Sequence, residues 1–279
     1  MRAWLYRNVS RPLSRRLYAT LDVPVEGGFR MLVDTRDILG SSLATRRLWE
    51  PHVTPVFRTL LSEGDVFADV GAHIGYYTLI ASRIVGPTGR VYALEPYLAN
   101  RQLLEVNVQS NEATNVRILA VAAGAARADG VLSMPHSGDA ARMSLTADGR
   151  AVEQQVSIVP LADIVDSDDV PRLGLIKIDV EGYEDRVLQG LEGLLSGGVV
   201  RPTILLEMHA HLNPGIRQQI ADFCRRNGLV PHLIGDDEGF NRRFSLPQQE
   251  ATRRITLDWL VSATPDHVEL LITPDDVAR

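Results

Sequence analysis

The stretch Glu63-Gly-Asp-Val-Phe-Ala-Asp-Val-Gly-Ala-His-Ile-Gly-Tyr-Tyr-Thr78 decides how this chain of 279 residues folds. The apolar run Val66–Val70 is typical of a strand that is buried on both faces of a sheet. The residues 71–75 begin and end with glycine, which predicts a tight turn. From Tyr76 to Val85 apolar residues recur at helical spacing, and Gly86 follows as a stop signal. We therefore predict a strand, a turn and a helix, with backbone N–H groups left free at the helix N-terminus.

A second predicted strand, residues 90–94, ends in an acidic residue, Glu95. A carboxylate at that position can accept hydrogen bonds from both hydroxyls of a ribose. The spacing Asp69-x-Gly71-x-x-x-Gly75 differs from the Gly-x-Gly-x-x-Gly of nicotinamide and flavin folds. Together with Glu95 it resembles the S-adenosylmethionine site of Rossmann-like methyltransferases.

The composition excludes several classes of protein. The 29 Lys and Arg residues against 35 Asp and Glu give a net charge of −6, which speaks against an electrostatic nucleic-acid binder. The single cysteine, Cys224, excludes an internal disulfide and fits a reducing compartment. No apolar run approaches the roughly 20 residues of a transmembrane helix, and no secretory signal is evident. We therefore expect a soluble cytoplasmic protein, and a homodimer is one candidate for its oligomeric state.

Residues 1–62 are predicted to form an N-terminal extension that caps the main domain. Its first part, residues 1–21, interleaves five arginines with apolar residues and has no acidic residue. Such a segment could make peripheral contact with anionic lipid. The alternative is a capping helix whose arginines stay in water, and we favour it because Pro12 limits a continuous helix.

Residues 63–279 read as one α/β domain in which strands and helices alternate. This rhythm predicts a doubly wound, mostly parallel, seven-stranded sheet. The region 130–159 breaks the rhythm with two alternating stretches, which predicts an antiparallel β-hairpin insertion. After the two strands already named, the further strands are expected at 115–122, 173–179, 203–209, 229–234 and 259–262, and residues 268–272 are a candidate for one more.

Four stretches resemble one family, the FkbM-like S-adenosylmethionine-dependent methyltransferases. They are the glycine turn within 64–75, Ala93-Leu-Glu-Pro96, the run from 159–163 into Lys177-Ile-Asp-Val-Glu-Gly-Tyr-Glu184, and 201–209. The resemblance covers roughly residues 60–210, and His73 departs from it because the family more often has Asn there. It implies a Rossmann-like class I fold and methyl transfer from S-adenosylmethionine to a hydroxyl of a sugar, glycolipid or polyketide-type natural product.

The cofactor site is expected around the glycine turn and the strand end that follows it. Small residues after the third strand would let an adenine ring lie against backbone, although they would also permit close packing. His73 would contact the cofactor or stabilise the turn. The expected cofactor-binding residues are Asp69, Gly71, Ala72, His73, Gly75, Glu95, Pro96 and Ala122.

The catalytic residues are expected at the carboxyl ends of the central strands. An alcohol is a poor nucleophile, so a base or a metal ion must draw its proton. Asp179 could be the base, a metal ligand or a structural acceptor, and with Glu207 it could share a Mg²⁺ ion. His209 is the best base by its ordinary pKa. Glu181 and Glu184 occupy similar strand-end positions.

Two other functions compete with this interpretation. A nicotinamide-dependent oxidoreductase would need the glycine pattern that is missing here. A binding scaffold that has lost catalysis would not need to keep its acidic strand ends. Methylation of DNA or RNA is disfavoured by the acidic charge and by the lack of an Asn-Pro-Pro-Tyr motif.

Overall fold

The computed structural model describes residues 20–134, 152–234 without 197, 211 and 214, 252–262 and 267–274. Residues 1–19 and 135–151 lie outside the described part. The predicted lipid contact and the tip of the insertion therefore stay predictions.

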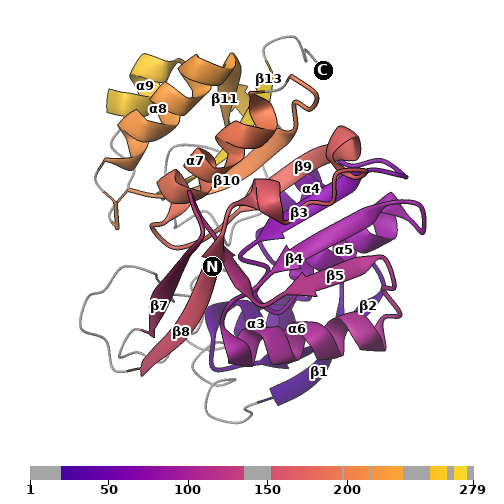
Figure 1. Cartoon of the computed structure of the whole chain (residues 1–279). Helices are drawn as coiled ribbons and strands as arrows, with labels where there is room; N and C mark the ends of the chain where they lie inside the picture. The colour runs from indigo at the N-terminus through magenta and orange to yellow at the C-terminus, as the bar shows by residue number, and fades with distance from the viewer. Residues whose placement is uncertain are drawn as a thin grey trace.

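The large sheet confirms the doubly wound α/β fold (Figure 1). Among the described residues its strand order is β12-β11-β13-β10-β9-β3-β4-β5, so eight strands are present there where seven were expected. The additional β12 is a short antiparallel edge strand beside β11. The five strands from β10 to β5 are parallel, and β13 runs antiparallel between β10 and β11. The strands are β3 (Val66–Val70), β4 (Arg90–Leu94), β5 (Val116–Leu119), β9 (Leu173–Ile178), β10 (Thr203–His209), β11 (Leu229–Ile234), β12 (Thr252–Arg254) and β13 (His267–Pro274).

Each face of the sheet carries its own apolar core, because side chains alternate along a strand. In β3, Ala68 packs with helices α7 and α8, whereas Phe67 packs with α5 and the N-terminal extension. The expected strand at 259–262 is wrong, since it belongs to helix α9, which buries Leu260 in the first core. So short an apolar run does not distinguish a strand from a helix. The helices are α5 (Tyr76–Val85), α6 (Leu98–Ser110), α7 (Glu184–Leu195), α8 (Ile216–Asn227) and α9 (Leu257–Ser262), with 3₁₀ turns η3 (Leu161–Asp163) and η4 (Val170–Arg172).

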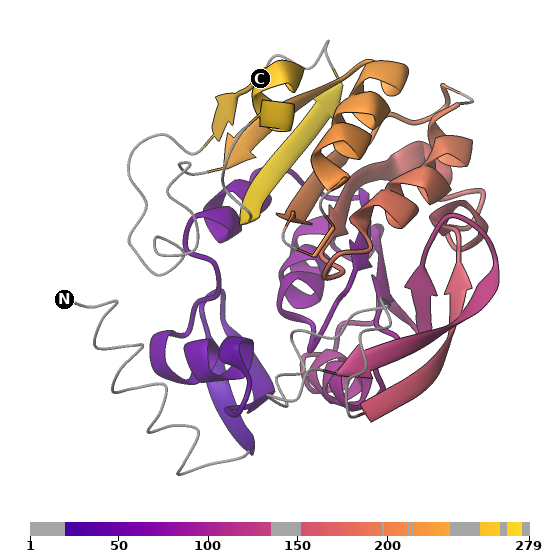
Figure 2. The same ribbon diagram turned by 90° about the vertical axis from the view of Figure 1, so that its left-hand side faces the viewer.

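The described part of the N-terminal extension shares the second core with the sheet. In Figure 2 the indigo elements of the extension are separated in space from the orange and yellow helices α7, α8 and α9. Asn107 of α6 binds both backbone groups of Leu32, at 2.6 Å from its N and 3.1 Å from its O, and also the carbonyl of Ile74 in the glycine turn at 2.8 Å. The extension is thereby tied to the expected cofactor site. Its elements are β1 (Thr20–Val25), β2 (Phe29–Asp34), α3 (Ile38–Arg46) and α4 (Val53–Phe57).

In its described part the insertion forms, together with β6, a separate three-stranded sheet of order β6-β8-β7. As expected, β7 (Ala128–Met134) and β8 (Val152–Val159) are antiparallel. The third strand of the large sheet is shorter than predicted, because β5 ends at Leu119 and β6 (Val121–Ala123) pairs with β8 instead. The expected adenine-side residue Ala122 therefore lies in the small sheet.

Candidate active site

Glu95 is held at the end of β4 by two backbone groups. One carboxylate oxygen accepts the N–H of His73 at 2.8 Å, and the other accepts the N–H of Tyr97 at 2.8 Å. Burial raises the pKa of Glu95 to about 8, against the opposing effect of these two hydrogen bonds. When Glu95 is ionised, each oxygen retains a second lone pair, so the carboxylate can then accept two ribose hydroxyls.

The glycines of the turn allow close packing of the protein against itself. Gly71 has φ +87°, and a Cβ there would overlap the backbone carbonyl oxygen of Asp179. At Gly75, with φ +93°, a Cβ would lie 2.6 Å from Cδ1 of Leu104 in α6. Gly71 therefore lets the turn approach the end of β9, and Gly75 lets it approach α6.

The N–H groups at the start of the turn are bonded within the protein, and they precede the helix N-terminus at Tyr76, where free N–H groups were expected. Those of Gly71 and Ala72 both donate to the carbonyl of Leu94 at 3.0 Å, while His73 donates to Glu95. These bonds join the turn to β4 and fix its position beside Glu95.

The side chain of His73 is the clearest indication that a polar ligand fits beside the glycine turn. Its backbone has φ 52°, and both ring nitrogens are buried without a hydrogen-bond partner among the described residues. Burial, and then the charge of Lys177, lower its pKa to about 4, so the ring is neutral with one donor and one acceptor. Buried polar groups are normally paired, so these two atoms suit a bound nucleotide.

The remaining expected cofactor residues lie around this turn. Asp69 is buried and accepts the Thr78 hydroxyl at 2.6 Å, and burial raises its pKa. The carbonyl of Pro96 accepts from Gln154 of β8 at 2.7 Å, which links the small sheet to Glu95. Ala122 is buried and pairs in register with Ile158, so its contact with adenine stays a prediction.

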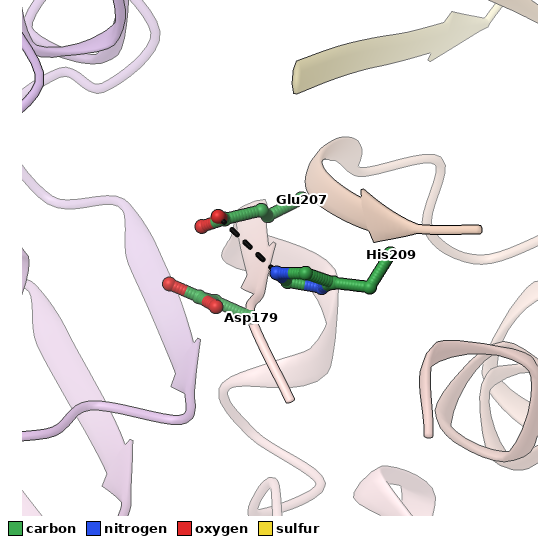
Figure 3. A group of neighbouring side chains, drawn as sticks. All are labelled: Asp179, Glu207 and His209. Atoms are coloured by element: carbon green, nitrogen blue, oxygen red, sulfur yellow. Dashed lines mark ion pairs between the residues drawn. The ribbon is translucent and has the colours of Figure 1, made fainter. Parts of the chain in front are cut away.

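Polar side chains from neighbouring strands gather on the face that carries the N-terminal extension. Asp69, Lys177 and Glu207 alternate with residues of the opposite core, and therefore point to this face. Figure 3 shows Asp179, Glu207 and His209 brought together, as the sequence predicted. One ligand atom from each of these three lies within 4.8 Å of the other two.

The surroundings of His209 do not favour the neutral ring that a general base needs, although its ordinary pKa suggested that role. Its Nδ1 lies 2.7 Å from Glu184, and its Nε2 lies 3.4 Å from both Glu207 and Glu181. Burial lowers its pKa, but the hydrogen bond to Glu184 and the other carboxylates outweigh burial and raise the pKa well above the ordinary value. At neutral pH the ring is therefore a cation, and it must lose a proton before it can act as a base.

Asp179 has the more suitable pKa for a base. Its carboxylate accepts a hydrogen bond from Lys177 Nζ at 2.9 Å, and its side chain is 25% exposed. Burial and the neighbouring Glu207 raise its pKa to about 6, although Lys177 opposes them. A base with a pKa near the working pH combines availability with proton affinity.

Two further carboxylates near Glu207 were not predicted from sequence. Glu269 of β13 stands directly opposite Glu207 in the antiparallel register. Glu50, between α3 and α4, is buried and accepts the Tyr77 hydroxyl at 2.6 Å. Oxygens of Glu50, Glu207 and Glu269 lie within 4.8 Å of one another. No local pattern marks Glu50, because only the fold brings the extension to this strand end.

The carboxylates of Asp179 and Glu207 are the expected ligands of the predicted Mg²⁺ ion. Oxygen ligands of this kind suit magnesium. However, the ammonium of Lys177 binds Asp179, and the protonated ring of His209 faces Glu207, so each expected ligand already has a cationic neighbour. A metal ion would have to compete with these two charges.

Residues 69–230, more than half of the chain, match the methyltransferase FkbM domain. The chain belongs to the FkbM methyltransferase family. It is thus a methyltransferase, and the family match includes the glycine turn, Glu95 and the acidic strand ends described above.

Two curated relatives share part of this FkbM-family chain. The hexuronic acid methyltransferase AglP of Haloferax volcanii is 27% identical over 66% of this chain and 73% of its own length. The 31-O-demethyl-FK506 methyltransferase FkbM of Streptomyces tacrolimicus is 33% identical over 47% of this chain and 61% of its own.

A solved structure, methyltransferase FkbM from Methylobacillus flagellatus KT, aligns with a TM-score of 0.49 and 16% identity. The alignment covers 77% of this chain and 47% of that chain, so this methyltransferase spans less than half of its neighbour. Within the part of the chain that the structure describes, no helix has the length and apolar character needed to cross a bilayer.

Proposed function

We propose that this protein is an S-adenosylmethionine-dependent O-methyltransferase that acts on a hydroxyl of a sugar, glycolipid or polyketide-type natural product. The observation that carries the proposal is the pairing of a nucleotide-type turn at Glu95 and His73 with the base candidate Asp179 on the adjacent strand end. The names of the two curated relatives, which refer to a hexuronic acid and to 31-O-demethyl-FK506, support these acceptor classes.

In this proposal the cofactor supplies a methyl group that its sulfonium activates. The protein then has two tasks, to align the acceptor and to remove its proton. Glu95 and His73 would hold the ribose side of the cofactor, and Asp69 would lie near its methionyl end. Asp179, largely ionised at neutral pH because its pKa is about 6, would take the hydroxyl proton. His209 would act as a cation beside Glu207, with its ring held by Glu184.

Incubation with methyl-labelled S-adenosylmethionine and a panel of acceptors tests the function. The panel should contain neutral sugars, uronic acids and hydroxylated macrolides. We expect label in a methyl ether on one acceptor class and an equal amount of S-adenosylhomocysteine. Binding of the cofactor without turnover on any acceptor would favour a scaffold. Selective binding of a nicotinamide dinucleotide would favour an oxidoreductase.

A metal-dependent enzyme is the second candidate, because Asp179, Glu207 and His209 place ligand atoms within 4.8 Å of one another. We expect dialysis against EDTA to leave turnover unchanged, since Lys177 and protonated His209 already neutralise these carboxylates. The measurement is turnover before chelation, after chelation and after Mg²⁺ is added back. Loss on chelation with recovery in Mg²⁺ would make Asp179 and Glu207 metal ligands instead.

A further inference from the structure

Lys177 is the only lysine in the chain, whereas the other 28 of the 29 basic Lys and Arg residues are arginines. It is also buried, on strand β9 in the middle of the large sheet. Lysine and arginine are not interchangeable at such a place, because an ammonium is a compact charge and a guanidinium is a wide planar one. A chain that otherwise uses arginine throughout thus keeps its one lysine where space is limited.

The contacts of Lys177 show what the ammonium does. Its Nζ lies 2.9 Å from Oδ2 of Asp179 and 5.0 Å from the centre of the Tyr77 ring. Across the sheet it stands in register with Asp69 of β3, whose Oδ2 accepts the Thr78 hydroxyl. The one carboxylate in hydrogen-bond contact with the ammonium among these neighbours is therefore Asp179.

Burial of the Lys177 side chain costs free energy, because a buried ammonium loses its hydration. Burial lowers the pKa of Lys177, but Asp179, Glu50 and the other carboxylates raise it above the ordinary value, so the side chain stays charged. A charged partner fixes the Asp179 carboxylate through one oxygen. Among the described residues the other oxygen of Asp179 has no hydrogen-bond partner, so it is available to an acceptor.

We propose that Lys177 is a positioning residue for methyl transfer, which holds the Asp179 carboxylate through Oδ2 and for which arginine is no substitute. The inference rests on the proposed role of Asp179 as base, and it adds the residue through which that base is oriented. Lys177 itself need not touch the acceptor.

A double-mutant cycle tests this role. Lys177→Met keeps the length of the side chain without its charge, and we expect kcat to fall about 10²-fold, as a misplaced catalytic group does, with little change in the KM for S-adenosylmethionine. Lys177→Arg should not restore kcat. In an Asp179→Asn background Lys177→Met should have no further effect, because the two residues act as one unit. Losses that multiply, a kcat within twofold of wild type, or rescue by arginine would overturn the proposal.

A crystal structure of Lys177→Met provides a readout that needs no acceptor. We expect the Asp179 carboxylate to turn away from its wild-type position, and an unmoved carboxylate would overturn the positioning role even if no acceptor is ever methylated. Should the single variant not fold, Lys177→Met with Asp179→Asn, which removes both charges, is compared with Asp179→Asn alone. Arg117→Met is the control, since it removes an exposed ion pair to Asp166 at 3.0 Å, and should leave kcat unchanged.

Discussion

Asp179→Asn should lower kcat by about 10²–10⁴-fold, the usual contribution of a general base. Asparagine has the shape of aspartate and can still accept the hydrogen bond from Lys177, but it cannot take a proton from an alcohol. The affinity for S-adenosylhomocysteine, measured by calorimetry, should stay close to that of the wild type. A near-wild-type kcat would eliminate Asp179 as the base.

The same assignment predicts a pH profile. Because the base must be ionised and its pKa is raised to about 6, kcat/KM should fall as the pH drops below about 6 and level off above it. Asp185→Asn is a matched control, since this buried carboxylate at the start of α7 binds Asn213 at 3.1 Å and lies outside the proposed site. Its variant should keep both the wild-type rate and the acid limb.

Gly71→Ala should abolish detectable binding of S-adenosylhomocysteine and destabilise the protein by about 3 kcal/mol. A single methyl group there would overlap the carbonyl of Asp179, in a backbone conformation of φ +87° that alanine already avoids. The turn would have to move away from β9 and from Glu95. The clash is with the protein itself, so cofactor affinity and thermal stability should fall together.

Gly64→Ala separates the clash from the backbone strain. Gly64 has φ +88°, almost the same as Gly71, but a Cβ there would lie 3.7 Å from Thr88, an ordinary contact. We expect this variant to lose only about 1–2 kcal/mol of stability and to bind S-adenosylhomocysteine normally. Calorimetry and thermal unfolding of both variants decide the matter. If the two variants bound S-adenosylhomocysteine with equal affinity, the glycine turn would not be part of the cofactor site.

Much of the fold was predictable because its signals are local. The buried run before Gly71, the turn and the strand that ends in Glu95 need only their own residues to be recognised. Short or divided segments were less predictable. The end of β5 at Leu119 depends on a pairing of β6 with β8, some 35 residues further along, and α9 depends on packing against α8.

The sequence by itself determined the alternation of strands and helices, the mostly parallel sheet and the acidic residues at the carboxyl ends of its strands, since alternation and turn chemistry are properties of neighbouring residues. Only the tertiary structure decided the charges at the site. It places Glu50 beside Glu207, surrounds His209 with carboxylates and binds Lys177 to Asp179. A pKa is set by burial and by charges within a few ångströms. Lys177 and Asp179 are only two residues apart, but Glu50 and Glu184 reach Glu207 and His209 from distant parts of the chain.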